Sequence, residues 1–299
     1  MAVLSAAVRY APQRPFRSLT VPLRGLQYHV CEWGDADAPP LVMLHGWMDV
    51  GASFQFVVDA LPGRWRVLAP DWRGFGRSSW PAADCYWFPD YLADLDALLD
   101  ALVGEAPLAL LGHSMGGNVA MLYAGVRPAR VRRLINLEGF GLRAAPPEEA
   151  PARYAQWLDE LKARPGLRDY ASVDEVIARL RKTNQRLTPA RAAFLAQHWA
   201  TRNAAGRWEI AGDPAHRIVN PVLYRWAEVQ ACWARITAPV LWVEGAHTDA
   251  HKWAGSAEEL ASRRAVLPNL QFEIVQDAGH MIHHDQPEEL ARLLAAFLR

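Results

Sequence analysis

A serine in the middle of a glycine-rich turn is the residue of this chain best suited to covalent chemistry. Ser114 lies in the segment Gly112-His113-Ser114-Met115-Gly116-Gly117, directly after the apolar run 108–111. The pattern G-x-S-x-G between a strand and a helix holds a serine on a sharp turn with its hydroxyl exposed. A side chain at Gly112 or Gly116 would collide with the crossing strand and helix. We therefore predict that Ser114 is a covalent nucleophile.

A histidine late in the chain is the candidate base for this serine. A serine hydroxyl is a poor nucleophile at neutral pH, and it needs an adjacent general base that is oriented by an acid. The segment 277–284 follows the last predicted strand, and within it Gly279 gives the loop freedom to present His280 over the carboxyl edge of the sheet. We select His280 as the base and interpret His283 and His284 as packed or solvated residues near the start of the last helix.

Backbone N–H groups are the candidates for stabilising negative charge on a substrate oxygen. Such charge requires preorganised donors. One candidate is the N–H of Met115, directly after the nucleophile, and the other is the N–H of Trp47 in the loop 45–49. Gly46 would allow substrate to approach this loop closely. We predict an oxyanion hole formed by Trp47 and Met115.

These residues need a framework of buried strands. Short, continuously apolar runs are typical of strands covered on both faces, and they recur at 41–44, 66–69, 108–111, 134–137, 240–243 and 270–275. Helical patterns lie between most of them, notably at 91–103, 118–126 and 288–298. Two segments with alternating apolar and polar residues flank Arg24-Gly25, and they indicate an antiparallel hairpin over 16–33. The alternation predicts a mostly parallel sheet with helices on both faces.

The alternation stops between residues 142 and 235. Helix-like patterns occur at 153–163, 173–182 and 189–199, and no convincing strand pair is visible. We predict a helical insertion over 142–235 and a core domain formed by 1–141 and 236–299. Most tryptophans of the insertion are interpreted as core residues of this lobe, with one or two facing a pocket between lobe and sheet: Trp157, Trp199, Trp208, Trp226 and Trp233.

Composition narrows the classes of partner. The 32 Lys and Arg residues balance the 32 Asp and Glu residues, so the overall charge gives no sign of nucleic acid or an anionic membrane as partner. Residues 1–14 contain an apolar run too short to span a bilayer, with no basic residue before it, and we interpret them as a frayed or docked arm rather than as a secretory signal. We expect a small, weakly charged ligand and no stable membrane insertion.

Cysteine and histidine spacing gives no sign of a metal or a disulfide framework. The chain has three cysteines, far apart and without C-x-x-C spacing, at Cys31, Cys85 and Cys232. This usage fits a reducing cytoplasm. A metal centre on the three histidines of 280–284 lacks a carboxylate group at suitable spacing, so we predict no metal site and no cofactor.

Taken together and in order, these motifs resemble the α/β-hydrolase family. The matching segments are His45-Gly46-Trp47, 71–78, 112–117, 127–131 and Gly279-His280. The resemblance covers nearly the whole chain outside the insertion. It implies an eight-stranded, mostly parallel sheet, and it implies that 142–235 is a mobile helical cap over the active site. A serine nucleophile distinguishes the chain from the haloalkane dehalogenase and epoxide hydrolase branches, which use an aspartate.

The resemblance leaves two candidates for the acid of the triad. The family usually places this acid just after the seventh strand, where Asp249 stands one residue later than the commonest spacing. Glu138 at the end of the sixth strand is the alternative, because certain dehalogenase-like relatives carry their acid there. Both carboxylates would lie at the same sheet edge. We favour a Ser-His-Asp triad with Asp249 and interpret Glu138 as a buried pocket residue.

The family supports several functions. The leading interpretation is a serine hydrolase, a carboxylesterase that cleaves esters of small, largely apolar substrates through an acyl-enzyme on Ser114. A carbon–carbon bond hydrolase of ring-cleavage products is the alternative, because those substrates carry carboxylates that arginines of the insertion could bind: Arg143, Arg153, Arg202 and Arg225. Further interpretations are a haloperoxidase-like activity, an amide-cleaving activity, or a non-catalytic small-molecule receptor. Substrate preference and oligomeric state stay open.

Overall fold

The computed structural model describes residues 10–299. Most of the predicted N-terminal arm, residues 1–9, lies outside the described part. The end of the arm is docked on the core, because the Tyr10 hydroxyl donates a hydrogen bond of 2.6 Å to Asp59. Two backbone N–H groups, those of Gln13 and Arg14, also donate to the Asp59 carboxylate.

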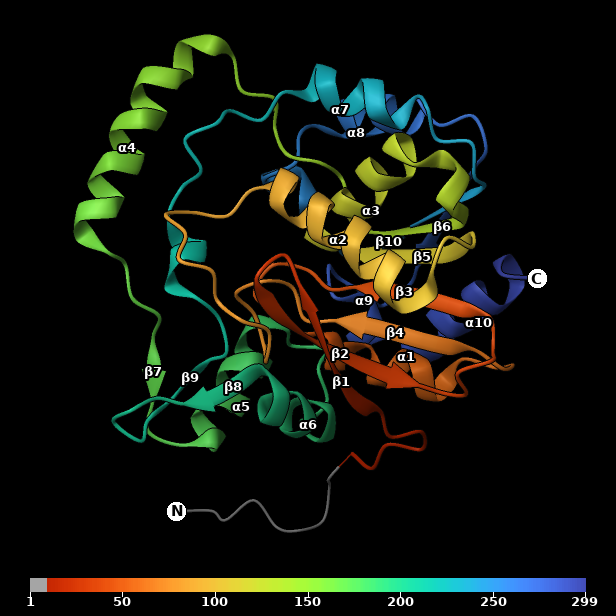
Figure 1. Ribbon diagram of the computed structural model, residues 1–299, viewed down its shortest axis with the longest axis horizontal. Helices are drawn as coiled ribbons and strands as arrows, with labels where there is room; N and C mark the ends of the chain where they lie inside the picture. The colour runs from red at the N-terminus through yellow and green to blue at the C-terminus, as the bar shows by residue number, and fades with distance from the viewer. Residues whose placement is uncertain (1–9) are drawn as a thin grey trace.

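One eight-stranded sheet forms the centre of the molecule (Figure 1). Its spatial order is β1 (Arg17–Leu23), β2 (Leu26–Trp33), β4 (Arg66–Pro70), β3 (Pro40–Leu44), β5 (Leu108–His113), β6 (Val131–Leu137), β10 (Val240–Gly245) and β11 (Leu270–Val275). β1 pairs antiparallel with β2, β2 pairs antiparallel with β4, and the remaining neighbours are parallel. The predicted sheet class is confirmed, and the predicted hairpin over 16–33 is β1 and β2.

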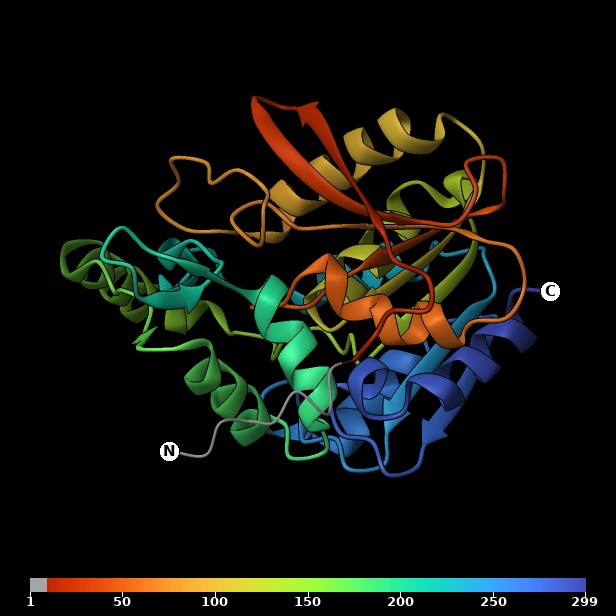
Figure 2. The ribbon, with the colours of Figure 1, turned by 90° about the horizontal axis from the view of Figure 1, so that it is seen from below.

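Helices cover both faces of this sheet (Figure 2). On one face lie α2 (Phe88–Val103), α3 (Met115–Val126), α7 (Trp226–Trp233) and α8 (Ala257–Arg264), and on the other lie α1 (Gln55–Ala60), α9 (Ile282–Asp285) and α10 (Pro287–Phe297). Successive side chains of a strand point to opposite faces. In β5, Leu108 and Leu110 therefore join one buried cluster, while Ala109 and Leu111 join the other. This double burial explains the continuously apolar run of β5. The expectation that the segment 270–275 is also covered on both faces is wrong, because β11 is an edge strand and its residues 271, 272 and 274 are exposed.

The segment between β6 and β10 forms a separate lobe. It contains α4 (Ala150–Ala163), α5 (Val173–Thr183) and α6 (Pro189–Trp199), and α4 lies at the outer left of Figure 1. The expectation that this segment has no strand pair is wrong. A three-stranded antiparallel sheet joins β7 (Asp169–Tyr170), β9 (Trp208–Ile210) and β8 (Ala200–Arg202). Strands of two or three residues are too short to show a period-2 pattern.

The end of this lobe differs from the predicted boundary at residue 235. α7 lies within the predicted insertion, but it packs on α3, and Trp233 is fully buried in the core beneath it. The lobe that stands away from the sheet therefore ends before α7. Short 3₁₀ helices complete the chain: η1 (Gly51–Phe54), η2 (Pro128–Arg130), η3 (Pro147–Glu149), η4 (Pro214–Arg217) and η5 (Ala250–Lys252). Among residues 10–299, no helix combines the length and apolar character needed to cross a bilayer.

Candidate active site

Ser114 occupies a strained turn between β5 and α3. Its φ of 53° lies in the left-handed region that non-glycine residues rarely adopt, and its N–H donates to the carbonyl of Leu137 at 2.8 Å. A Cβ added at Gly112 would lie 2.2 Å from the carbonyl oxygen of Gly116. A Cβ at Gly116 would lie 2.3 Å from that of Leu44. These short distances show that only glycine fits at both positions, as the sequence predicted.

We expect Gly116→Ala to destabilise the protein strongly, because the atoms that the new methyl group meets belong to the rigid backbone of β3. Overpacking of this kind costs up to about 3 kcal/mol. For a chain of this size, about 3 kcal/mol corresponds to a fall in Tm of roughly 6–12 °C. Gly166→Ala is the matched control, since an added Cβ there meets no atom within 4 Å. Equal melting temperatures of the two variants would contradict the steric argument.

His280 lies between the serine and a carboxylate. Its Nε2 is 3.0 Å from Ser114 Oγ, and its Nδ1 is 3.1 Å from Glu138 Oε2. The arrangement fits the neutral tautomer in which Nδ1–H donates to the carboxylate and Nε2 accepts from the serine hydroxyl. The three residues come from the loops after β5, β6 and β11. They lie within the distances that a nucleophile, a base and an orienting acid require.

Glu138 is fixed in place by the neighbouring strand. Its side chain is fully buried and accepts hydrogen bonds from the N–H of Gly245 at 2.7 Å and from the Thr248 hydroxyl. Its φ of 56° turns the residue sharply at the end of β6. Parallel pairing of β6 with β10 brings Leu137 opposite Val243, so the loop after β10 lies beside Glu138. The carboxylate is therefore held by the segment in which the acid had been expected.

The structure places Asp249 away from His280, contrary to the preference stated from the sequence. The Asp249 side chain is 55% exposed and pairs with Lys252 at 3.2 Å. The turn after β10 directs Thr248 toward the site and leaves Asp249 as the residue that precedes η5. We therefore correct the expected partner of His280 from Asp249 to Glu138. Sequence alone gave both carboxylates the same position at a strand end, and only the turn geometry separates them.

The candidate oxyanion loop lies directly beside the nucleophile. A Cβ added at Gly46 would be 3.1 Å from the Cβ of Ser114. Trp47 follows Gly46 and lines the same cavity as Ser114. Met115 begins α3, so its N–H is one of the first four of the helix, which have no intrahelical acceptor. Trp47 and Met115 as oxyanion donors stay a prediction.

A cavity of about 530 Å³ opens over the triad. Ser114, His280 and the loop 46–49 line its floor, and the lobe between β6 and α7 supplies apolar side chains to its walls, namely Leu167, Tyr170, Leu180, Leu187, Leu195, Trp199 and Ile210. Trp199 also donates its ring N–H to the carbonyl of Met48 at 2.5 Å. The lobe is therefore joined to the candidate oxyanion loop, and one of the five tryptophans of the insertion faces the pocket as expected.

Arginines line this cavity, but they are different from those that the sequence suggested. Arg168, Arg179 and Arg217 lie on its wall, and no ion pair joins them to a carboxylate among residues 10–299. The suggested residues Arg143, Arg153, Arg202 and Arg225 do not line it. Periodicity could not reveal which arginines face the cavity, because α5, η4 and the residue just before β7 bring them together from distant positions.

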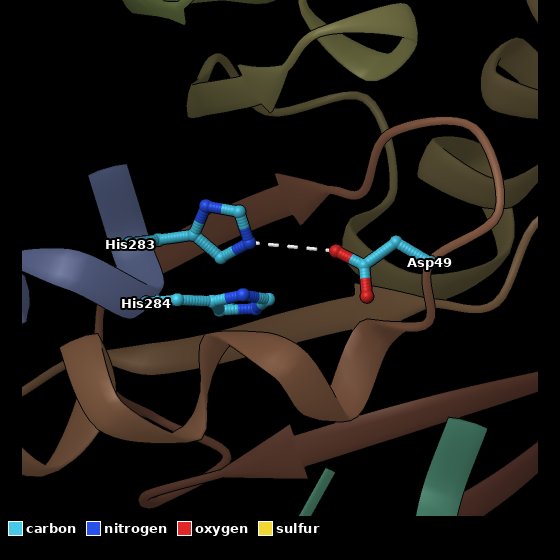
Figure 3. A group of neighbouring side chains, drawn as sticks. All are labelled: Asp49, His283 and His284. Carbon is cyan, nitrogen blue, oxygen red and sulfur yellow. Dashed lines mark hydrogen bonds and ion pairs between the residues drawn. The ribbon is translucent and has the colours of Figure 1, made fainter. Parts of the chain in front are cut away.

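A buried group of polar side chains borders the cavity, and Figure 3 shows its three residues. It contains Asp49, His283 and His284, and His283 Nε2 is 3.4 Å from Asp49 Oδ2. Burial lowers the pKa of His284 to about 3, so its imidazole is neutral at physiological pH. Both histidines are buried, which excludes the solvated alternative of the sequence interpretation. Asp49 was not singled out, because it is separated from them by more than 200 residues.

The fold and the site define the class of this protein: the chain belongs to the α/β-hydrolase fold family, whose model matches residues 39–287. It is therefore a hydrolase of the α/β fold. It is 31% identical to 3-hydroxybutyrate-oligomer hydrolase of Cupriavidus necator, over 90% of this chain and 91% of that protein. It is 26% identical to serine hydrolase-like protein 2 of Homo sapiens, with 89% of each chain covered.

Further matches extend this picture. The thioesterase domain of the curacin biosynthetic pathway superposes with a TM-score of 0.81 at 26% identity, covering 93% of this chain and 98% of that domain. A 110-residue stretch is 37% identical to the serine hydrolase-like protein of Danio rerio, and this match spans 33% of that protein. The predicted family resemblance is thus confirmed.

Proposed function

We propose that the protein is a serine hydrolase that cleaves carboxylic esters of small substrates through an acyl-enzyme on Ser114. The observation that carries this proposal is the position of His280, 3.0 Å from Ser114 Oγ and 3.1 Å from Glu138 Oε2, at the floor of the cavity. His280 Nε2 accepts the hydroxyl proton while Ser114 Oγ attacks the ester carbonyl carbon. The N–H groups of Trp47 and Met115 donate to the resulting oxyanion.

The remaining steps use the same groups. Collapse of the tetrahedral intermediate breaks the bond to the alcohol, which receives the proton from His280. Water then gives a proton to His280 and attacks the acyl carbon. Collapse of this second tetrahedral intermediate breaks the bond between the acyl carbon and Ser114 Oγ, and Oγ takes the proton from His280 as the acid is released. The Glu138 carboxylate orients the imidazole and stabilises its protonated form. No cofactor is needed in this scheme.

Two further observations support the proposal. The activities of two related proteins, a hydrolase of 3-hydroxybutyrate oligomers and a thioesterase, are compatible with acyl transfer. The three cysteines are free thiols, as suits the reducing cytoplasm that we propose as its location. The lobe over residues 142–225 would act as the cap that shields the acyl-enzyme from bulk water.

The test is a series of 4-nitrophenyl esters of increasing acyl length, combined with labelling by a fluorophosphonate probe. We expect turnover and a single label on Ser114. Tight binding of a small molecule without turnover or labelling would instead favour a receptor on the same fold. That result would overturn the esterase proposal.

The arginines of the cavity favour acidic substrates, which keeps a carbon–carbon bond hydrolase as the second candidate. Arg168, Arg179 and Arg217 lie on the wall of this cavity. In the described part of the chain, Asp49 is the one carboxylate that lines it, and Asp49 is buried and already bonded to Ser53. Guanidinium groups bind carboxylates by charge-assisted hydrogen bonds. A substrate with a carboxylate remote from the scissile bond would place its charge against this wall. This applies to either reaction.

We therefore expect the enzyme to prefer the mono-4-nitrophenyl ester of adipic acid over 4-nitrophenyl hexanoate, which has the same number of acyl carbons. Arg179→Gln should lower kcat/KM for the adipate ester about tenfold, the size of one exposed charge-assisted contact, and leave that for the hexanoate unchanged. Arg202→Gln is the control, because Arg202 lies outside the cavity. A neutral preference in the parent enzyme would refute the role of these arginines.

A further inference from the structure

We propose that Asp49, His283 and His284 bind one divalent transition-metal ion of the class that includes Zn²⁺. Figure 3 shows both imidazoles projecting from α9 toward the Asp49 carboxylate. One ligand atom from each of the three residues lies within 4.8 Å of the others. The 3.4 Å between His283 Nε2 and Asp49 Oδ2 is close to the edge, about 3.3 Å, of a tetrahedral site with bonds of about 2.0–2.1 Å.

The donor set indicates the kind of ion. Two imidazole nitrogens and one carboxylate oxygen suit Zn²⁺, Co²⁺ or Ni²⁺, whereas Ca²⁺ and Mg²⁺ favour oxygen ligands throughout. The three residues therefore form a donor set that favours such an ion over Ca²⁺ or Mg²⁺.

The hydrogen bonds at this place are incomplete. Within the described residues, the Asp49 carboxylate has one short partner, the Ser53 hydroxyl at 2.9 Å. His283 Nε2 has contacts only at 3.4 and 3.5 Å, which are too long for strong hydrogen bonds. Among residues 10–299, His284 Nε2 is buried with no hydrogen-bond partner. Buried polar atoms are normally satisfied, and a buried carboxylate normally has a cation beside it. A bound ion would meet both requirements.

The position of the group gives the ion a structural role. Asp49 lies two residues after Trp47 in the loop between β3 and η1. His283 and His284 lie on α9, which begins two residues after His280. An ion would therefore clamp the candidate oxyanion loop to the segment that carries the base. It can be reached from the cavity, which Asp49 and His284 both line. The inference does not depend on the esterase proposal, because it rests on a different set of side chains.

Calorimetry on the full chain tests the site, using protein treated with EDTA and titrated with ZnCl₂. We expect one equivalent to bind with micromolar or tighter affinity, a rise in Tm with zinc concentration, and tetrahedral ligand-field bands when Co²⁺ is used instead. His284→Gln and Asp49→Asn should weaken binding roughly 100-fold or more, since each removes one ligand. His247→Gln is the control, because His247 is an exposed histidine outside the group.

The titration is repeated in His280→Ala to separate this site from the triad, which also offers an imidazole and a carboxylate. Zinc binding that persists in His280→Ala and is lost in His284→Gln supports the proposal. If Asp49→Asn fails to fold, His283→Gln takes its place. The proposal is overturned by the absence of stoichiometric binding, by binding that is lost with His280, or by an equal loss in His247→Gln.

Discussion

Ser114→Ala is expected to abolish ester turnover and fluorophosphonate labelling while the protein stays folded. Loss of the nucleophile from a serine triad lowers kcat by a factor on the order of 10⁶. In this chain the expected loss is complete for practical purposes, because Ser114 Oγ is the hydroxyl that lies against His280 Nε2 at the floor of the cavity. The measurement is kcat on the best 4-nitrophenyl ester together with gel detection of the label.

Ser262→Ala provides the control for this variant. Ser262 is an exposed helix residue whose hydroxyl contacts only its own helix, so activity and Tm should not change. Labelling that survives in Ser114→Ala would show that another residue is the nucleophile. Turnover that survives without labelling would show that hydrolysis proceeds without an acyl-enzyme.

Glu138→Gln is expected to lower kcat by a factor on the order of 10⁴, the effect of exchanging the carboxylate of a triad for an amide. The amide lacks the charge that stabilises the protonated His280. It also presents an NH₂ group to donors, because the N–H of Gly245 and the hydroxyl of Thr248 already point at this position. Asp249→Asn should retain nearly full activity, since its side chain pairs only with Lys252 at the surface.

Both variants are measured on one ester, with melting curves to separate folding from chemistry. A large loss of kcat in Asp249→Asn together with a nearly normal kcat in Glu138→Gln would show that the loop after β10 rearranges to present Asp249. Equal losses in both, with unchanged Tm, would show that the two carboxylates act together. The expected result is a difference of several orders of magnitude in favour of Asp249→Asn.

The parts of this molecule that sequence could predict are those in which local pattern and tertiary role coincide. The strand before Ser114 is buried on both faces, so its apolar run is visible directly, whereas the strand before His280 is an edge strand with exposed residues. The glycines around Ser114 are required by contacts with backbone atoms of β3 and α3. Because such constraints determine which residue types can occur at these positions, the sheet and the pairing of Ser114 with His280 could be predicted.

The features that escaped prediction depend on how a loop turns or on which distant segments meet. Glu138 and Asp249 follow parallel strands, and only the positive φ of Glu138 and the turn at Thr248 decide which carboxylate reaches His280. Asp49 meets His283 through packing of the β3 loop against α9, with no spacing rule to reveal it. The small sheet of the lobe consists of strands too short for a pattern.

The order of the site residues along the chain has a consequence for biosynthesis. Ser114 and its base are separated by 166 positions, and the lobe that lines the cavity lies between them in the chain. Until residue 280 has been synthesised, the nascent chain holds the nucleophile turn and Glu138 but lacks the proposed base for the serine. The proposed hydrolysis can therefore begin only after the segments that enclose the pocket have been made.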